Sequence, residues 1–241
     1  MQFIRSLAVL PAILLISAFA PDKTANGNST YATITKAFSA ETGSINSNHL
    51  FTEWNLKNYN LPEKAFTQAV KGFEYLKQKN LICNNILSIV DFSKASSQKR
   101  LFIIDMNSGK MLFHTIVAHG QNSGLKYAAA FSNDADSHKS SLGFYITLQT
   151  YNGDNGYSLK LKGCEKGIND NAYDRAIVLH GAAYADDSFV SSHGYAGRSY
   201  GCPAVPATKS KKIIDTIKDG SCLFIYHPNK KYVTQSKILN K

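Results

Sequence analysis

The alternation of apolar and polar positions divides the chain into a helical start and a strand-rich remainder. From Leu61 onward, apolar residues recur at three- and four-residue spacing, which marks one face of an amphipathic helix. Pro62 suits the first turn of such a helix. The apolar positions are Ala65, Phe66, Ala69, Phe73 and Leu76. The pattern predicts a helix that packs on the side of the main domain.

Short apolar runs separated by turn residues then predict a series of β-strands. The expected strands are 86–92, 101–106, 111–118, 144–148, 175–180 and 221–226. Asn107–Lys110 forms a strong hairpin signal between two of them, and a short helix at 213–218 is stopped by Gly220. The sum predicts a mainly β, β-rich α+β domain with a largely antiparallel sheet and few helices.

Two long polar segments interrupt these strands. Residues 120–141 and 151–174 are rich in Gly, Ser and Asn, and the pattern predicts loops for both. Loops of this length within a compact domain are usually binding loops or lids.

The N-terminal segment has the pattern of an export signal. A short basic start precedes an apolar run, and Ala18 and Ala20 supply the small residues that a signal peptidase requires. We expect a signal peptide at 1–20, a loosely ordered lead-in at 21–60, a helical segment at 61–85 and a catalytic domain at 86–241. Pro21 just past the expected scissile bond leaves later cleavage or an uncleaved anchor open. Export predicts a periplasmic or cell-envelope location.

The net charge of +10 favours association with polyanions, such as cell-wall polymers or anionic lipid. Export argues against nucleic acid as the partner. A second interpretation, that dispersed lysines simply cover a soluble surface, is equally open.

The four cysteines lie in different sequence contexts. Cys83 and Cys222 lie in apolar stretches and are expected to be buried, and Cys164 lies in a Gly-flanked loop. Cys202 lies in a Gly-Cys-Pro turn between polar residues, where a reactive thiol is typically placed. An exported chain permits disulfides, and three pairings remain open. With no Cys-x-x-Cys pair and no metal-ligand spacing, no metal or other cofactor is expected.

His180 and Cys202 form the candidate catalytic pair. His180 ends an apolar strand and is followed by Gly181, while Gly201 precedes the cysteine. The glycines permit close approach of substrate and direct backbone N–H groups at an oxyanion. Prolines and a helix after the cysteine favour the thiolate. A histidine within hydrogen-bond reach completes an activated nucleophile, which predicts a Cys/His acyl-transfer enzyme of unknown substrate.

A family resemblance narrows this prediction. His180-Gly181 followed by Ser199-Tyr200-Gly201-Cys202 resembles the signature of the L,D-transpeptidase catalytic domain, the YkuD-type fold. The context Gly-Arg-Ser-Tyr-Gly-Cys-Pro-Ala at 197–204 resembles one branch of that family. The fold that this implies is a β-sandwich or barrel with a few flanking helices.

The resemblance implies a reaction on peptidoglycan stem peptides, with Cys202 as nucleophile and His180 as base. The Gly181 carbonyl would orient the imidazole, and N–H groups near Gly201 and Cys202 would form the oxyanion hole. A second stem peptide would supply the acceptor amine, and water would replace it in a carboxypeptidase variant.

Two positions depart from the family pattern. Tyr200 stands where the family typically has His, and Ala204 stands where an Arg is common, so the roles of that His and Arg are not carried over. Arg198 is a candidate for the missing positive charge, and His193 is a second candidate imidazole for substrate binding.

Two further interpretations stay open. A papain-like or NlpC/P60-like cell-wall peptidase is disfavoured, because such enzymes place the nucleophile before the base. A non-catalytic peptidoglycan-binding protein would fit the long loops equally well, with Cys202 merely buried.

Overall fold

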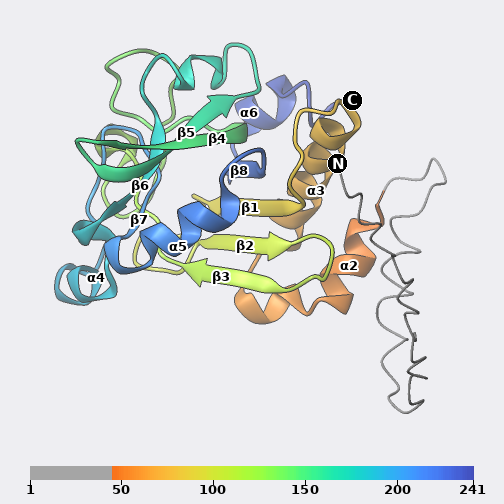
Figure 1. Ribbon diagram of the computed structural model, residues 1–241, viewed down its shortest axis with the longest axis horizontal. Coiled ribbons are helices and arrows are strands. Elements are labelled where there is room, and N and C mark those ends of the chain that lie inside the picture. Colours follow the sequence, from red (N-terminus) through yellow and green to blue (C-terminus); the bar gives the residue numbers. More distant parts are fainter. Residues whose placement is uncertain (1–44) are drawn as a thin grey trace, which may run out of the picture.

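The structure is a computed structural model that describes residues 45–241 (Figure 1). The expected signal peptide and the first part of the expected lead-in lie outside the described residues. Among the helices of residues 45–241, none has the length and apolar character of a membrane span.

The described residues form a single eight-stranded mixed sheet. The strands are β1 Ile86–Asp91, β2 Leu101–Asp105, β3 Met111–Thr115, β4 Gly143–Gly153, β5 Gly156–Gly163, β6 Val178–Ala182, β7 Ala204–Pro206 and β8 Cys222–Tyr226. Their order across the sheet is β3-β2-β1-β8-β4-β5-β6-β7. Only the β1–β8 and β6–β7 pairs are parallel, so the prediction of a mainly antiparallel β domain is confirmed.

The two ends of this sheet come close to one another. Ala118, beyond the end of β3, pairs with Ala204 of β7 in an isolated antiparallel bridge. The Ala118 N–H donates to the Ala204 carbonyl at 2.7 Å. A second bridge joins Gly120 to Ser199. The sheet is therefore nearly closed, in agreement with the barrel-like fold that the sequence resemblance implied.

Helices cover the sheet at several places. The α-helices are α2 Ser47–Glu53, α3 Glu63–Gln78, α4 Asp187–His193, α5 Ala207–Ile217 and α6 Lys230–Gln235. The short 3-10 helices are η1 Leu56–Tyr59, η2 Gln121–Ser123, η3 Asp170–Ala172 and η4 Ala183–Ala185. Helix α3 packs against β1 and β8, whereas α5 packs against β5, β6 and β7 (Figure 1).

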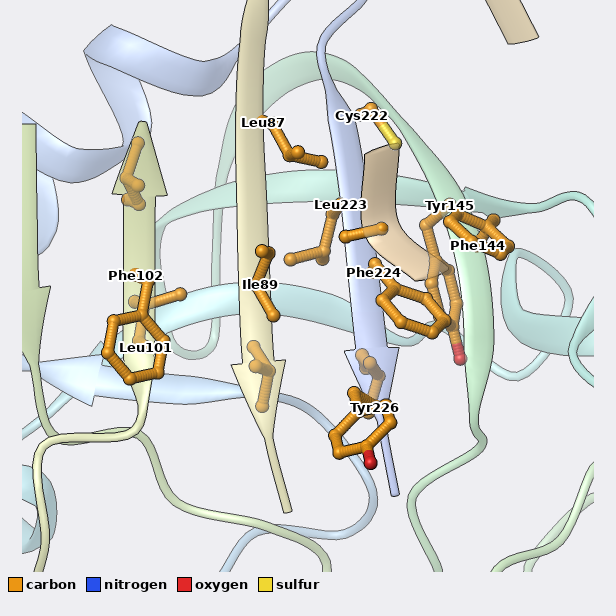
Figure 2. Close-up of a cluster of buried hydrophobic side chains, with 14 of the residues drawn as sticks. Leu87, Ile89, Leu101, Phe102, Phe144, Tyr145, Cys222, Leu223, Phe224 and Tyr226 are labelled. Carbon is orange, nitrogen blue, oxygen red and sulfur yellow. The ribbon is translucent and has the colours of Figure 1, made fainter. Parts of the chain in front are cut away.

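Helix α3 confirms the first sequence prediction. All five predicted apolar positions are buried on its inner face. Between them, Gly72 faces the ring of Phe144 so closely that a Cβ there would lie 2.0 Å from a ring carbon. Phe144 in turn stacks on Phe224 at a centroid distance of 4.2 Å (Figure 2). The absence of a side chain at Gly72 therefore lets the helix approach the sheet.

Two expectations about loops and order were wrong. Part of the expected lead-in is ordered, because Leu50, Phe51 and Leu56 of α2 and η1 are buried in the main core. Part of the expected 151–174 loop is the end of β4 and all of β5, joined by a two-residue turn. Glycines at both ends of β5 concealed its alternating pattern. The expected loop at 120–141 is confirmed apart from η2.

We expect Gly72→Ala to destabilise the fold despite the better helix propensity of alanine. Propensity favours the substitution by about 1 kcal/mol, but the added methyl group collides with a fully buried aromatic ring, and overpacking costs about 1–3 kcal/mol. Chemical denaturation would measure a lower free energy of unfolding. Lys64→Ala, at an exposed position of the same helix, is the control and should leave stability nearly unchanged. A more stable Gly72→Ala protein would contradict this packing.

Candidate active site

His180 lies in the middle of β6, between Ser158 of β5 and Ala204 of β7. The strand continues beyond it to Ala182, so the histidine does not end the strand as expected. Its Nδ1 lies 3.0 Å from the Gly181 carbonyl oxygen. A carbonyl only accepts, so Nδ1 carries the proton and Nε2 keeps its lone pair. Burial lowers the pKa of His180, which favours this neutral form.

Gly181 is required by the packing of α5 onto β6. A Cβ at this position would lie 2.5 Å from the Ser210 hydroxyl oxygen and 3.3 Å from the Cα of Ala207. Any side chain would therefore push α5 away from the strand that carries His180.

The turn that carries Cys202 is shaped by its neighbours. Gly201 has a φ of +121°, and a Cβ there would lie 2.9 Å from the Lys139 carbonyl oxygen. Ser199 closes the turn, because its hydroxyl donates to the Cys202 carbonyl at 2.6 Å and accepts from the Gly201 N–H at 3.1 Å. The Gly201 N–H is thus engaged within the turn. After Pro203 the chain enters β7 before α5 begins, so the cysteine does not directly precede a helix as expected.

The Cys202 thiol contacts the backbone of the segment leading into His180. The Val178 N–H donates to Sγ at 3.4 Å, and the thiol lies 3.8 Å from the Ala176 carbonyl oxygen. Only 9% of Cys202 is exposed. Burial raises the pKa of Cys202, while the Val178 hydrogen bond and the nearby Arg175 charge oppose this shift. The resting pair is therefore a neutral thiol and a neutral imidazole, with the thiol held against the backbone at Val178, two residues before His180.

Arg175 is a site residue that the sequence reasoning did not identify. Its guanidinium donates to the Ser132 and Lys139 carbonyls at 3.0 and 2.8 Å, and to the Ser141 and Ser137 hydroxyls at 2.8 and 3.1 Å. These hydrogen bonds hold residues 132–141, here called the arc, next to the turn that carries Cys202. The Lys139 carbonyl oxygen of this arc approaches Gly201. No local sequence pattern marks Arg175 for this role, because its partners at 132–141 lie far away in the sequence.

Tyr184 is a second residue that the sequence reasoning missed. Burial, together with the proximity of the Cys202 thiol, raises the pKa of its hydroxyl to about 12. A Cβ at Gly197 would lie 2.5 Å from the Tyr184 Cβ, so that glycine makes room for the tyrosine. Tyr184 therefore stays a neutral hydroxyl near the Cys202 thiol.

Two buried residues, Arg100 and His119, support the turn that carries Cys202. Arg100 donates to Nδ1 of His119 at 2.8 Å, and because a guanidinium never accepts, His119 Nε2 donates to the Gly124 carbonyl. Burial and the Arg100 charge lower the pKa of His119 to about 4. The Ser199 N–H donates to the His119 carbonyl at 3.0 Å, which ties this pair to the turn.

The structure places three other candidate residues away from the thiol. His193 is exposed at the end of α4, where its ring stacks on Phe189 at 3.9 Å. Arg198 is exposed, and its guanidinium donates to the Gln121 carbonyl at 3.4 Å. Tyr200 is 69% exposed and stacks on His138 at 4.5 Å, so its ring extends away from the buried thiol.

A hollow of about 310 Å³ opens beside the cysteine turn, between residues 135–138, residues 174–176 and Tyr200. A second hollow of about 280 Å³ between Phe131 and Tyr232 does not include the Cys/His pair.

The four thiols are unpaired, and Cys83 is exposed rather than buried as expected, because it lies in the turn before β1. Cys222 is buried, as predicted. Within residues 45–241 no three His, Cys, Asp or Glu side chains gather in an arrangement that would hold a metal ion.

Comparisons with known proteins bear on this site. A family model described as the L,D-transpeptidase catalytic domain matches residues 57–226. No curated protein matches the chain.

Several solved structures are similar to the chain at low identity. An L,D-transpeptidase from Mycobacterium smegmatis has 13% identity and a TM-score of 0.38, with 59% of each chain covered. LdtMt1 in complex with imipenem has 12% identity and a TM-score of 0.37, again with 59% of each chain covered. The helical cell shape determining protein Pgp2 (K307A mutant) from Campylobacter jejuni has 15% identity and a TM-score of 0.40, with 68% of this chain and 55% of that chain covered. The chain thus spans less than two thirds of the length of these proteins.

The family model covers more than half of the chain, and His180 and the Cys202 turn both lie inside the matched region. This chain belongs to the L,D-transpeptidase catalytic domain family.

Proposed function

We propose that this protein is an exported L,D-transpeptidase of the cell envelope that forms a thioester at Cys202 with a peptidoglycan stem peptide. One observation carries the proposal. The Cys202 thiol rests on the backbone of the segment that presents His180, and the Gly181 carbonyl holds that imidazole with Nε2 as the free base.

The neutral resting pair defines the first chemical step. The thiol leaves its contact with the Ala176 carbonyl, gives its proton to His180 Nε2, and attacks the carbonyl carbon of the L-centre of the stem peptide. The C–S bond forms as the carbonyl becomes an oxyanion. Because the Gly201 N–H is engaged by Ser199, the Cys202 N–H is the donor of this turn that serves the oxyanion.

Collapse of this intermediate breaks the C–N bond. The protonated His180 gives its proton to the leaving amine of the terminal D-amino acid, and a thioester remains. An acceptor amine then loses a proton to His180 and attacks the thioester, and Cys202 leaves as a thiol. Donor and acceptor stem peptides are thus the proposed partners, and a protein with a net charge of +10 would be attracted to an anionic wall or membrane surface.

Removal of either member of the pair tests this reaction. We expect Cys202→Ala to lower transfer by at least about 10⁴-fold and His180→Ala by about 10²–10⁴-fold, both measured as D-alanine release from a tetrapeptide muropeptide with an amine acceptor. Imipenem, the ligand bound in one solved relative, should give a covalent adduct on the Cys202 peptide by mass spectrometry.

His193→Ala is the matched control, because that imidazole stacks on its own helix and should be dispensable. Unchanged melting temperatures would show that the variants fold. Full transfer by folded Cys202→Ala would refute the proposal. Release of D-alanine without transfer to the amine would show a carboxypeptidase, and binding without release would show a non-catalytic wall protein.

The Arg175 charge provides a test of thiol ionisation. Burial raises the Cys202 pKa and Arg175 opposes this rise, so Arg175→Gln should raise the pKa further and move the alkylation profile to higher pH. The rate of iodoacetamide labelling against pH would measure the shift, with Arg175→Lys expected to lie closer to the wild type. Arg198→Gln, at an exposed position, is the control. An unshifted profile in a folded Arg175→Gln protein would show that Arg175 acts through packing alone.

The same ionisation states predict the pH dependence of turnover. Because burial lowers the His180 pKa and raises the Cys202 pKa, the neutral pair persists over a wide range. The value of kcat/KM should rise with pH through the His180 pKa, which lies below the ordinary value for histidine, and then stay level up to the Cys202 pKa, which lies above the ordinary value for cysteine. A narrow optimum near pH 7 would contradict the neutral resting pair.

A further inference from the structure

Lys160, Val178 and Cys202 lie opposite one another on three neighbouring segments of the sheet, and this set of residues is called the row below. Lys160 pairs directly with Val178, whose N–H donates to Cys202 Sγ. The β6–β7 register, which pairs His180 with Ala204, places Cys202 opposite Val178 when continued by two residues. Because neighbouring strands lie about 4.8 Å apart, two strand spacings put the Lys160 Cα about 10 Å from the Cys202 Cα.

The side chain of Lys160 lies on the catalytic face of the sheet. Ser158 and Lys160 of β5 pair with His180 and Val178 of β6, and paired residues direct their side chains to the same face. The opposite face at this point is covered by α5, which contacts Gly181. Lys160 of β5 and His180 of β6 are therefore diagonal neighbours on adjacent strands, on the face away from α5.

Two tyrosines hold the Lys160 ammonium in place. Its Nζ lies 5.5 Å from the ring centroid of Tyr151 and 5.7 Å from that of Tyr173. A cation between two aromatic rings is fixed in position while its N–H groups stay available to an anion. In the part of the chain that the structure describes, the carboxylate partners of lysines are Asp187 and Asp215, and neither pairs with Lys160.

We propose that Lys160 binds the terminal carboxylate of the D-amino acid that leaves the donor stem peptide. This inference rests on the proposed function, which places the scissile carbonyl one residue before the free carboxyl terminus. Three bonds of about 1.3–1.5 Å join that carboxyl carbon to the scissile carbon, so the two lie about 3–3.7 Å apart. The scissile carbon itself approaches the thiol to about 3–3.5 Å. The path from the thiol through the scissile carbon to the carboxyl carbon therefore covers most of the separation between the Cys202 and Lys160 backbones. The Lys160 side chain covers the remainder. Lys160 thus selects stem peptides that end one residue after the attacked carbonyl.

Three donor peptides test this assignment on the full protein. The first is a tetrapeptide with a free D-alanine carboxylate, the second has that carboxylate replaced by an amide, and the third keeps the free terminus but has lysine in place of diaminopimelate. Loss of a charge-assisted hydrogen bond predicts that Lys160→Gln lowers kcat/KM for the first and third peptides by roughly 10- to 100-fold. The variant should match the wild type on the amide.

Matched variants sharpen the test. Lys160→Arg should keep most activity on the free carboxylate, because the charge is retained. Lys162→Gln, two residues along the same strand and exposed, should change none of the three rates. Two outcomes for Lys160→Gln would overturn the assignment. One is an equal loss of kcat/KM on the free-carboxylate and amide peptides. The other is a loss on the diaminopimelate peptide that is absent on the lysine-containing peptide. A wild-type protein inert towards all three would overturn the proposed function itself.

Discussion

The closure of the sheet on itself is the constraint on which the site depends. The segment after β3 meets β7 through the Ala118–Ala204 bridge, and the Gly120–Ser199 bridge continues the contact. The turn between Ser199 and Ala204 is thereby held on one side by residues 118–121 and on the other by β6. Cys202 lies in this turn, at the seam where the two ends of the sheet meet. Its position relative to His180 is therefore set by backbone pairing rather than by side-chain contacts alone.

The same seam determines the ionisation of the pair. A turn enclosed between two backbone segments is largely dry, and burial shifts the thiol and the imidazole pKa values in opposite directions, each towards its neutral form. Among residues 45–241 the cation that moderates the thiol pKa is Arg175, and its guanidinium is held by hydrogen bonds to the arc at 132–141. Rigidity and electrostatics therefore come from one set of contacts, because the arc that packs on Gly201 also fixes the charge.

Local patterns allowed part of this structure to be predicted, and non-local contacts account for what was missed. Helix α3 was predictable because its apolar spacing is regular. Glycines next to His180 and Cys202 drew attention to both positions, and the structure places the Cys202 thiol against the backbone two residues before His180. Strand β5 was missed, since Gly156 and Gly163 at its ends are typical of loops. Arg175 and Lys160 gain their positions from residues far away in the sequence, and no local pattern distinguishes them from other surface cations.

The two departures from the family motif have physical reasons in this fold. Ala204 is fully buried and pairs across the seam with Ala118, so the arginine common at its position would have no space. The charge near the thiol comes instead from Arg175, on the neighbouring strand connection. Tyr200 extends into solvent and stacks on His138, where a histidine would also face away from the thiol. In the proposed mechanism a single imidazole, that of His180, therefore serves as the base, and it is held by the backbone carbonyl of Gly181 that follows it.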